Sequence, residues 1–423
     1  MHKTDPKFLV EQLFRSEYGK VMAALTHAFG TAQLENIEDA VQDAMIRAMQ
    51  LWGFKEVPAN PTAWLYKVAR NRVIDQLRKD QLHESIGRSN PVFQPESENF
   101  DIVALEGNLK DSQLKMIFAC CHPSLSTQYQ LILSLKLIGG FNNRELSLAL
   151  LKKEDAIAKA FTRAKKQLKA SIKSLESPVA IGLSSRLFVV LRVIYLLFSE
   201  GYSSNSGTQL IKRDICYEAI RLALLLRENP YCRHEQLEAL IALMCFHASR
   251  FDARLDVNGG LVDLEHQDRD LYNGPLIRIG KEHLELAARL QKQPSKYYLE
   301  AAVAYEHCRA KTFDKTRWGK ILELYDRQLR LYDSPVVTLN RLVPFNRVHG
   351  PKMALVEFRT MEQHPEFQTS ALSYAILAEL YQGLAKFPEA IRSLQMAIKL
   401  SRNDAEKFHF IKKQQALRQK QLS

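Results

Sequence analysis

Two groups of side chains in this sequence have the types that metal or catalytic chemistry requires. Cys120-Cys121-His122 offers ligands that zinc prefers, but adjacent cysteines are poor joint ligands and no second Cys-x-x-Cys pair exists. An acidic group could bind calcium, although Arg254 would occupy the first position of an EF-hand loop; it comprises Asp256, Asn258, Asp263, Glu265 and Asp268. No nucleophile–base pair or phosphate loop is present. We therefore expect no catalytic residue, metal or cofactor, and we interpret the thiols as reduced core residues and the carboxylates as a structural Asp/Arg network.

Charge is distributed unevenly along the chain. The net charge of +12 favours a polyanionic partner. Residues 61–80 hold five basic and two acidic side chains, and residues 152–173 hold eight basic and two acidic ones. Residues 81–112 between them hold six acidic and two basic side chains. Two basic helices joined by an acidic connector form a pattern that the function has to explain.

Nearly all of the sequence has helical apolar periodicity, so we predict an all-α fold. One exception is Leu255–Leu264, where Asn-Gly between two alternating runs indicates a short β-hairpin. Residues 81–100 are polar and aperiodic, and a second boundary falls near Ser177-Pro178. We therefore predict four parts: a small helical domain over 7–80, an acidic linker over 81–108, a second small domain over 109–175 and a large helical domain over 180–420.

No membrane segment is expected. The residues after Met1 lack the apolar stretch of a signal peptide, and the longest apolar run, Leu187–Phe198, is interrupted by Arg192 and too short to span a bilayer. These features predict a cytoplasmic protein.

The first domain contains an amphipathic helix with an acidic face. Its apolar stripe at helical spacing comprises Ile37, Ala40, Val41, Ala44, Met45, Ala48 and Met49, and it ends at Trp52. The opposite face carries Glu38, Asp39, Gln42, Asp43 and Arg47. In isolation, this face could simply be solvated, with Asp43 and Arg47 as an i,i+4 pair.

The next helix is predicted to begin at Asn60-Pro61, because Asn is a good N-cap and Pro suits the first helical position. One side of this helix carries Trp64, Lys67, Asn71, Asp75 and Arg78, with Arg70 beside them. An aromatic ring among cationic and amide side chains suits single-stranded nucleic acid, since bases stack on the ring while cations meet phosphates. The alternative is that Trp64 belongs to the core and the charges solvate the helix.

The second domain has the pattern of a helix-turn-helix. Thr127–Leu137 is one amphipathic helix, and Asn142 and Glu145 have the spacing of a capping box for the next. A further helix from about Glu154 directs four apolar side chains inward, Ile157, Phe161, Ala164 and Leu168, and basic ones outward. The second helix of such a motif enters the major groove of DNA.

Glu38–Ala44 and Pro61–Arg78 together resemble the second conserved domain of sigma-70 family RNA polymerase sigma factors, and most closely the extracytoplasmic-function group. The resemblance implies that the acidic helix binds the β′ clamp helices of core RNA polymerase through Glu38, Asp39, Gln42, Asp43 and Arg47. It also implies that the loop over residues 53–60 and the following helix read and melt the −10 element, through Trp64, Lys67, Arg70, Asn71, Asp75 and Arg78. Sigma factors perform no covalent chemistry, so the protein is not expected to be an enzyme.

The helix-turn-helix is similar to the fourth conserved sigma domain, with Phe161–Lys166 typical of its recognition helix. This resemblance implies contact with the polymerase β flap and recognition of the −35 promoter element by Lys152, Lys153, Lys159, Thr162, Arg163 and Lys166. Lys152-Lys153 is a departure, because small residues or Pro are more usual in this turn. In the family, the acidic linker threads the RNA exit path of polymerase in place of nucleic acid.

The C-terminal half resembles one subgroup of these factors that has a long helical extension, in Arg192–Tyr202 and Glu265–Arg269. Small and large residues at tetratricopeptide-repeat positions indicate helix pairs with a concave protein- or peptide-binding surface; these are Tyr374, Leu377, Ala378, Tyr381, Ala390 and Ala397. The predicted function is an alternative sigma factor whose C-terminal domain modulates activity in cis. The alternatives are a stand-alone helix-turn-helix regulator with a tetratricopeptide sensor domain, and a scaffold whose basic helices are incidental. The acidic helix and the Trp64 face favour the sigma factor.

Overall fold

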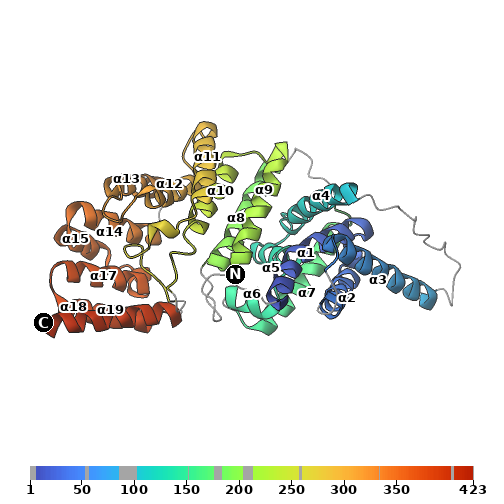
Figure 1. Cartoon of the computed structure of the whole chain (residues 1–423), viewed down its shortest axis with the longest axis horizontal. Helices are drawn as coiled ribbons and strands as arrows, with labels where there is room; N and C mark the ends of the chain where they lie inside the picture. The colour runs from blue at the N-terminus through green and yellow to red at the C-terminus, as the bar shows by residue number, and fades with distance from the viewer. Residues whose placement is uncertain are drawn as a thin grey trace. The chain divides into compact units, whose positions relative to one another are not determined.

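The protein is all-α, as the sequence predicts. The computed structural model describes residues 6–52, 57–84, 102–150, 152–175, 183–202, 213–256, 260–332, 334–401 and 404–422. Within these ranges it contains helices and no β-sheet (Figure 1). The helices form two compact units, of which the first comprises residues 1–198 and 217–232 and the second comprises residues 199–216 and 233–423.

Three helices open the first unit: α1 (Pro6–Phe29), α2 (Leu34–Trp52) and α3 (Pro61–Glu84). A short 3₁₀ turn, η1 (Thr31–Gln33), leads from α1 to α2. The start of α3 is confirmed, because the Asn60 Oδ1 atom accepts a hydrogen bond from the Ala63 amide at 2.9 Å and Pro61 is the first helical residue. α2 packs against α1 and α3, and it buries Ile37, Val41 and most of the predicted apolar stripe.

Four helices follow in the first unit: α4 (Ile102–Cys120), α5 (Thr127–Leu137), α6 (Asn143–Ala149) and α7 (Glu154–Ser171). The predicted bounds of α5, the start of α7 and the capping box are confirmed. The Asn142 side chain accepts from the Glu145 amide at 2.8 Å, and the Glu145 carboxylate accepts from the Asn142 amide at 2.9 Å. α6 and α7 therefore form the predicted helix–turn–helix pair, with Phe161 and Leu168 buried beneath α7.

The Asn142→Ala substitution is expected to lower the free energy of unfolding by about 1 kcal/mol, since it removes an N-cap acceptor from a short helix. Urea unfolding measures this loss. Arg144→Ala, two residues away and exposed, serves as the control and should change stability by less than about 0.5 kcal/mol. Equal effects of the two substitutions would show that the capping box contributes nothing.

The helices on either side of the predicted linker pack together within the first unit. α1 contacts both α4 and α5. Gly19 on α1 lies so close to the end of α5 that a Cβ atom there would be 2.1 Å from the Ile138 carbonyl oxygen. Only glycine permits this approach, so Gly19 is needed for the close packing of α1 against the end of α5.

The linker is shorter than the predicted 81–108. α3 continues to Glu84 and α4 begins at Ile102, so both helices extend into the acidic segment, and residues 85–101 lie outside the described residues. The predicted boundary at Ser177-Pro178 also lies outside them. α8 (Leu183–Tyr202) and α9 (Arg213–Glu228) belong in large part to the first unit.

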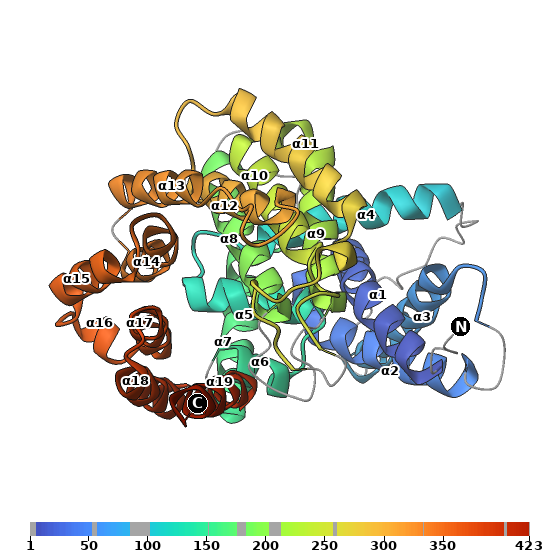
Figure 2. The ribbon, with the colours of Figure 1, turned by 60° about the vertical axis from the view of Figure 1, so that its left-hand side comes forward.

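The second unit is a succession of helices: α10 (Glu235–Ala248), α11 (Gly274–Leu290), α12 (Lys296–Arg309), α13 (Trp318–Leu331), α14 (Pro335–His349), α15 (Pro351–Met361), α16 (Pro365–Gln368), α17 (Ala371–Gly383), α18 (Phe387–Leu400) and α19 (Asp404–Leu422). α10 is buried on nearly every side and packs against α11 and α12. Figure 2 shows α12 to α19 following one another along a curved path. Each helix therefore packs chiefly on its neighbours, as in a helical repeat array.

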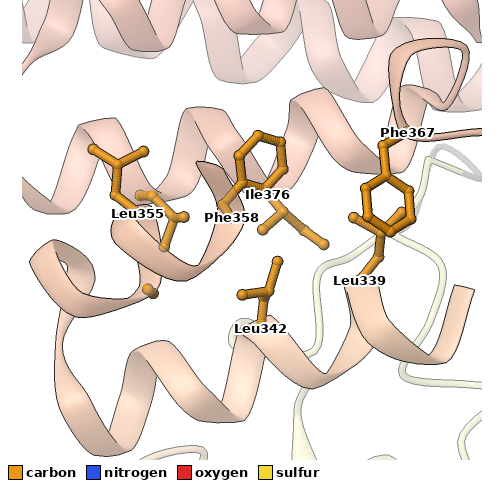
Figure 3. Close-up of a cluster of buried hydrophobic side chains, with 8 residues drawn as sticks. Leu339, Leu342, Leu355, Phe358, Phe367 and Ile376 are labelled. Atoms are coloured by element: carbon orange, nitrogen blue, oxygen red, sulfur yellow. The ribbon is translucent and has the colours of Figure 1, made fainter. Parts of the chain in front are cut away.

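Two apolar cores hold the C-terminal helices together. The first lies between α14, α15 and α17, and Figure 3 shows Leu342, Phe358 and Ile376 converging there. The second lies between α17, α18 and α19. It contains the small residues Ala378, Ala390 and Ala397, which are nearly inaccessible to solvent, with Tyr374 and Tyr381 packed against them. The small residues allow close approach of α17 and α18.

The predicted hairpin is reduced to one antiparallel bridge between Leu255 and Leu261 in the described residues, and residues 257–259, including Asn258, lie outside them. The acidic side chains around it form ion pairs with basic ones from elsewhere in the unit. Asp263 lies 2.8 Å from Lys413 Nζ and 3.0 Å from His409 Nε2. Burial disfavours ionisation of Asp263, but these two partners outweigh it and hold the pKa of the carboxyl below its usual range. Of the predicted acidic group, Asp256, Asp263 and Glu265 thus form ion pairs, and Lys and His supply partners as well as Arg.

Candidate nucleic-acid interface

The polar face of α2 is only partly as the sequence predicts. Asp39, Gln42 and Arg47 are exposed. Asp43 is partly exposed and accepts a hydrogen bond from the Arg72 Nε atom at 3.1 Å. Met49, which the sequence placed in the buried stripe, is 48% exposed, as is Ile46. The exposed surface of α2 therefore combines charged and apolar groups.

Glu38 does not share that surface. Its side chain is 12% exposed and lies 2.8 Å from the Nζ atom of Lys165 on α7, whose side chain is 10% exposed. Glu35 pairs with Lys169 on the same helix and lies 3.8 Å from Lys165. One acidic edge of α2 is therefore engaged by α7.

Further contacts join α7 to the same region. The Thr31 side chain hydrogen-bonds to the carbonyl groups of Ile172 and Lys173, just beyond the end of α7. The ammonium groups of Lys136 and Lys165 both lie over the Phe161 ring, at 4.6 Å from its centroid. Burial lowers the pKa of Lys136, and its neighbour Lys165 adds to this effect while Glu38 opposes it.

The face of α3 that the sequence singled out is present as one stripe. Lys67, Asn71, Asp75 and Arg78 are exposed, and Arg70 is half-buried beside them. Trp64 is half-buried, and its ring packs tilted against Trp52 at 5.3 Å between centroids. The indole therefore has one neighbour from the core and one part open to solvent, where a base could stack.

The polar side chains on and just before α7 fall into two groups. Lys159, Thr162, Arg163 and Lys166 are exposed on one face, and Lys152 and Lys153 are exposed just before the helix. The Thr162 hydroxyl donates to the Ala158 carbonyl oxygen at 3.1 Å, so its hydrogen atom is used within the helix. Lys165 and Lys169 point to α2 instead. One basic helix therefore combines a packed edge with an exposed cationic face.

Sequence reasoning missed the residues that join α2 to α7, namely Thr31, Glu35, Lys165 and Lys169. Lys165 directly follows the buried residue Ala164. The helical periodicity therefore predicts that Lys165 lies at the edge of the core, but it does not indicate which carboxylate pairs with it. The only available signal was the i,i+4 spacing of two lysines matched by the i,i+3 spacing of two glutamates.

Replacing Glu38 by Gln is expected to lower the free energy of unfolding of the chain by about 2 kcal/mol, because it leaves a nearly buried ammonium without its closest carboxylate. The loss stays moderate because Glu35 remains within 3.8 Å of Lys165. Urea unfolding followed by circular dichroism measures it. Adding Lys165→Met to the first substitution should restore most of the stability, since the unpaired charge is removed.

The matched control is Asp39→Asn, which removes an exposed carboxylate one residue away and should cost less than about 0.5 kcal/mol. The interpretation of the Glu38 pair is wrong if both carboxylates prove equally dispensable.

Within the described parts of the chain, no group of three or more His, Cys, Asp or Glu side chains is arranged to hold a metal ion. In the same parts, no helix has both the length and the apolar character needed to cross a membrane.

Comparison with known proteins bears on the region that contains α2 and α3. Residues 13–82, which contain α2 and most of α3, match sigma-70 region 2. Residues 186–288 match a family of unknown function, DUF6596. An uncharacterized protein of Rhizobium meliloti (strain 1021) is 34% identical over 392 residues, which cover 92% of this chain and 90% of that protein. No solved structure matches the chain.

Proposed function

We propose that this chain, which belongs to the sigma-70 family and is similar to the Rhizobium meliloti protein over 392 residues, is an alternative sigma factor of the extracytoplasmic-function group. It binds core RNA polymerase, recognises the −35 and −10 promoter elements and initiates transcription. The observation that carries the proposal is that the region 2 match coincides with α2 and α3, whose exposed faces differ in chemistry. The exposed face of α2 suits a protein surface, and the exposed face of α3 suits nucleic acid.

The exposed face of α2 docks on the clamp helices of the polymerase β′ subunit. Asp39, Gln42, Asp43 and Arg47 supply charge complementarity, and Ile46 and Met49 supply apolar area between them. Glu38, which the family resemblance included, is better assigned to the α2–α7 contact because Lys165 already neutralises it.

The exposed stripe of α3 captures the −10 element. Lys67, Arg70 and Arg78 meet phosphates, Asn71 and Asp75 contact base edges, and an unstacked base packs on the open part of Trp64. The preceding loop contributes as well, although residues 53–56 of that loop lie outside the described residues.

The exposed face of α7 reads the −35 element in the major groove. Lys159, Arg163 and Lys166 contact phosphates or base edges, and Thr162 contributes through its methyl group or its remaining acceptor capacity. Lys152 and Lys153 approach the backbone at the start of the helix. The same domain contacts the polymerase β flap, and the acidic linker lies in the RNA exit path of polymerase.

The helical C-terminal part modulates this activity in cis. Its support is the succession of packed helix pairs from α12 to α19, with small residues between α17 and α18 as in tetratricopeptide repeats. Such an array offers a surface for a protein or peptide partner. The cellular site of action is the cytoplasm, where core RNA polymerase is found.

The test is co-elution of the full chain with bacterial core RNA polymerase on size exclusion, followed by transcription from promoters selected from genomic DNA. Co-elution and promoter-dependent transcripts are expected. A chain that binds duplex DNA specifically but does not associate with polymerase would instead be a stand-alone helix-turn-helix regulator.

A further inference from the structure

Basic side chains from separate segments of the second unit converge around Tyr202, the last residue of α8. They lie on α10, on the turns that follow it, on the 3₁₀ turn η3 (Arg269–Leu271) and on α12, and they are His247, Arg250, Arg254, Arg269 and His307. No part of the proposed sigma function uses these residues.

Arg250 lies deepest in this cluster. This residue is only 9% exposed. The Nη2 atom donates to the Tyr202 hydroxyl at 3.1 Å and lies 3.4 Å from His247 Nδ1. Its Nε atom has no hydrogen-bond partner in the described structure, and the same is true of the buried Nδ1 atom of His307. Buried polar atoms without a hydrogen-bond partner are uncommon, and a buried guanidinium N–H can donate to a bound acceptor.

The other two arginines surround Tyr202 and α12. The Arg254 guanidinium lies over the Tyr202 ring at 3.8 Å from its centroid, and its Nη1 atom donates to the Tyr202 carbonyl oxygen at 3.3 Å. Arg269 donates to the His307 carbonyl oxygen at 3.1 Å and also hydrogen-bonds to the Tyr272 hydroxyl. Arg254, Arg269 and His307 are half-buried rather than sealed, so the cluster remains accessible from solvent.

No recorded ion pair with a carboxylate offsets the positive charge of the cluster within the part of the chain that the structure describes. Among the described residues, none of the three arginines forms an ion pair with a carboxylate. Three acidic residues close in sequence pair elsewhere: Asp252 lies 2.6 Å from Arg213, Asp263 2.8 Å from Lys413 and Glu265 3.4 Å from Arg347. The Asp268 side chain, next to Arg269, accepts from the Asp270 amide instead.

The pKa values of the two histidines in the cluster are lowered. Burial, followed by the charges of Arg250 and Arg254, lowers the pKa of His247 well below its usual value. Burial and the charges of Arg250 and Arg269 lower the pKa of His307 to about 3. Both imidazoles are therefore neutral at pH 7, and the guanidinium groups alone carry the charge. Unpaired cations in a site that is largely removed from water are costly unless an anion accompanies them.

We propose that this cluster is a binding site for a doubly charged oxyanion of the phosphate type, either free or as the phosphate group of a small molecule. Planar guanidinium groups bind tetrahedral oxyanions through pairs of hydrogen bonds, and Arg250 has an unused Nε–H for such a bond. Three positive charges match a dianion better than a single carboxylate. The site lies wholly within the second unit, and its binding of an anion does not depend on the sigma assignment.

Isothermal titration calorimetry of the full chain tests the proposal, with inorganic phosphate, sulfate and adenosine monophosphate as probes in chloride buffer of constant ionic strength. Binding of phosphate and of sulfate, each with a Kd below about 1 mM, is expected for a multi-arginine site. Similar affinities for the three probes indicate a site for the free dianion, whereas tighter binding of adenosine monophosphate indicates that a larger molecule carries the phosphate.

Arg254→Gln and Arg269→Gln should each weaken phosphate binding by at least about tenfold, since each removes one charge-assisted contact. Both side chains are half-buried, so these variants are less disruptive to folding than Arg250→Gln, which removes the buried central group. Arg250→Lys keeps the charge and is the conservative substitution at that position. The control is Arg289→Gln, an exposed arginine at the end of α11. Absence of binding by the unmodified chain, or equal weakening by Arg289→Gln and Arg254→Gln, overturns the proposal, because the first result removes the site and the second assigns the binding to general surface charge.

Discussion

A chain carrying Asp39→Lys and Asp43→Lys is expected to bind core RNA polymerase about a thousandfold more weakly, because each reversal turns an attraction across the interface into a repulsion worth about 2 kcal/mol. Asp39 is exposed on α2, and Asp43 is partly exposed one turn further along the same helix. Fluorescence anisotropy with a labelled chain and purified core polymerase measures the affinity. Circular dichroism and thermal unfolding establish that the variant is folded.

The two positions are not equivalent, and this allows a sharper test. Asp43 also pairs with Arg72 on α3, so its reversal places two cations together and disturbs the α2–α3 packing. Asp39 forms no such pair in the described structure, so Asp39→Lys alone tests the interface. This single variant should lose about half as much binding free energy as the double variant. Glu362→Lys, an exposed residue of the second unit with the same charge change, is the control. Unchanged polymerase affinity of the Asp39 variant would remove the role assigned to this face.

Replacing Arg163 and Lys166 by Ala is expected to weaken binding to −35 duplex DNA about a hundredfold at moderate salt, since each removes a phosphate or base contact worth about 1–2 kcal/mol. The slope of log K against log salt should also fall by about 1.8, which corresponds to two phosphate contacts. The two side chains lie one turn apart on the exposed face of α7. Filter binding or anisotropy over a salt series gives both quantities.

The control for this pair is the double variant Arg289→Ala and Lys292→Ala, which removes one arginine and one lysine with the same spacing from an exposed site in the second unit. It should leave the salt slope within about 0.3 of that of the unmodified chain. If the Arg163/Lys166 variant loses contacts in the −10 region and keeps those at −35, the roles of α3 and α7 have been assigned the wrong way round.

Local features of the fold could be predicted from the sequence because they depend on neighbouring residues. The N-cap at Asn60, the capping box of Asn142 and Glu145, and the bounds of α5 all follow from side chains within four positions. Met49 shows where this reasoning fails. It has the right spacing for the buried stripe, but the core beneath α2 ends with Ala48 and Trp52, so Met49 stays exposed.

Contacts between distant segments could not be predicted in this way. Glu38 and Lys165 are 127 residues apart in sequence, and neither residue carries a local sign of the other. The same holds for the cluster around Tyr202, whose members come from segments that the periodicity treats separately. In the sequence, Arg254 was notable only because it would occupy the first ligand position of an EF-hand loop. In the fold, it lies among other cationic side chains.

The six cysteines can serve as native probes of unfolding. All six are buried, with Cys120, Cys121 and Cys232 in the first unit and Cys216, Cys245 and Cys308 in the second. Burial raises the pKa of Cys121 to about 12 and that of Cys232 to about 11, so the reactive thiolate is scarce in the native state. An alkylating reagent therefore modifies these thiols chiefly when the surrounding helices open. Peptide mapping of the alkylated thiols would time the opening of each unit separately, with no cysteine introduced by mutation.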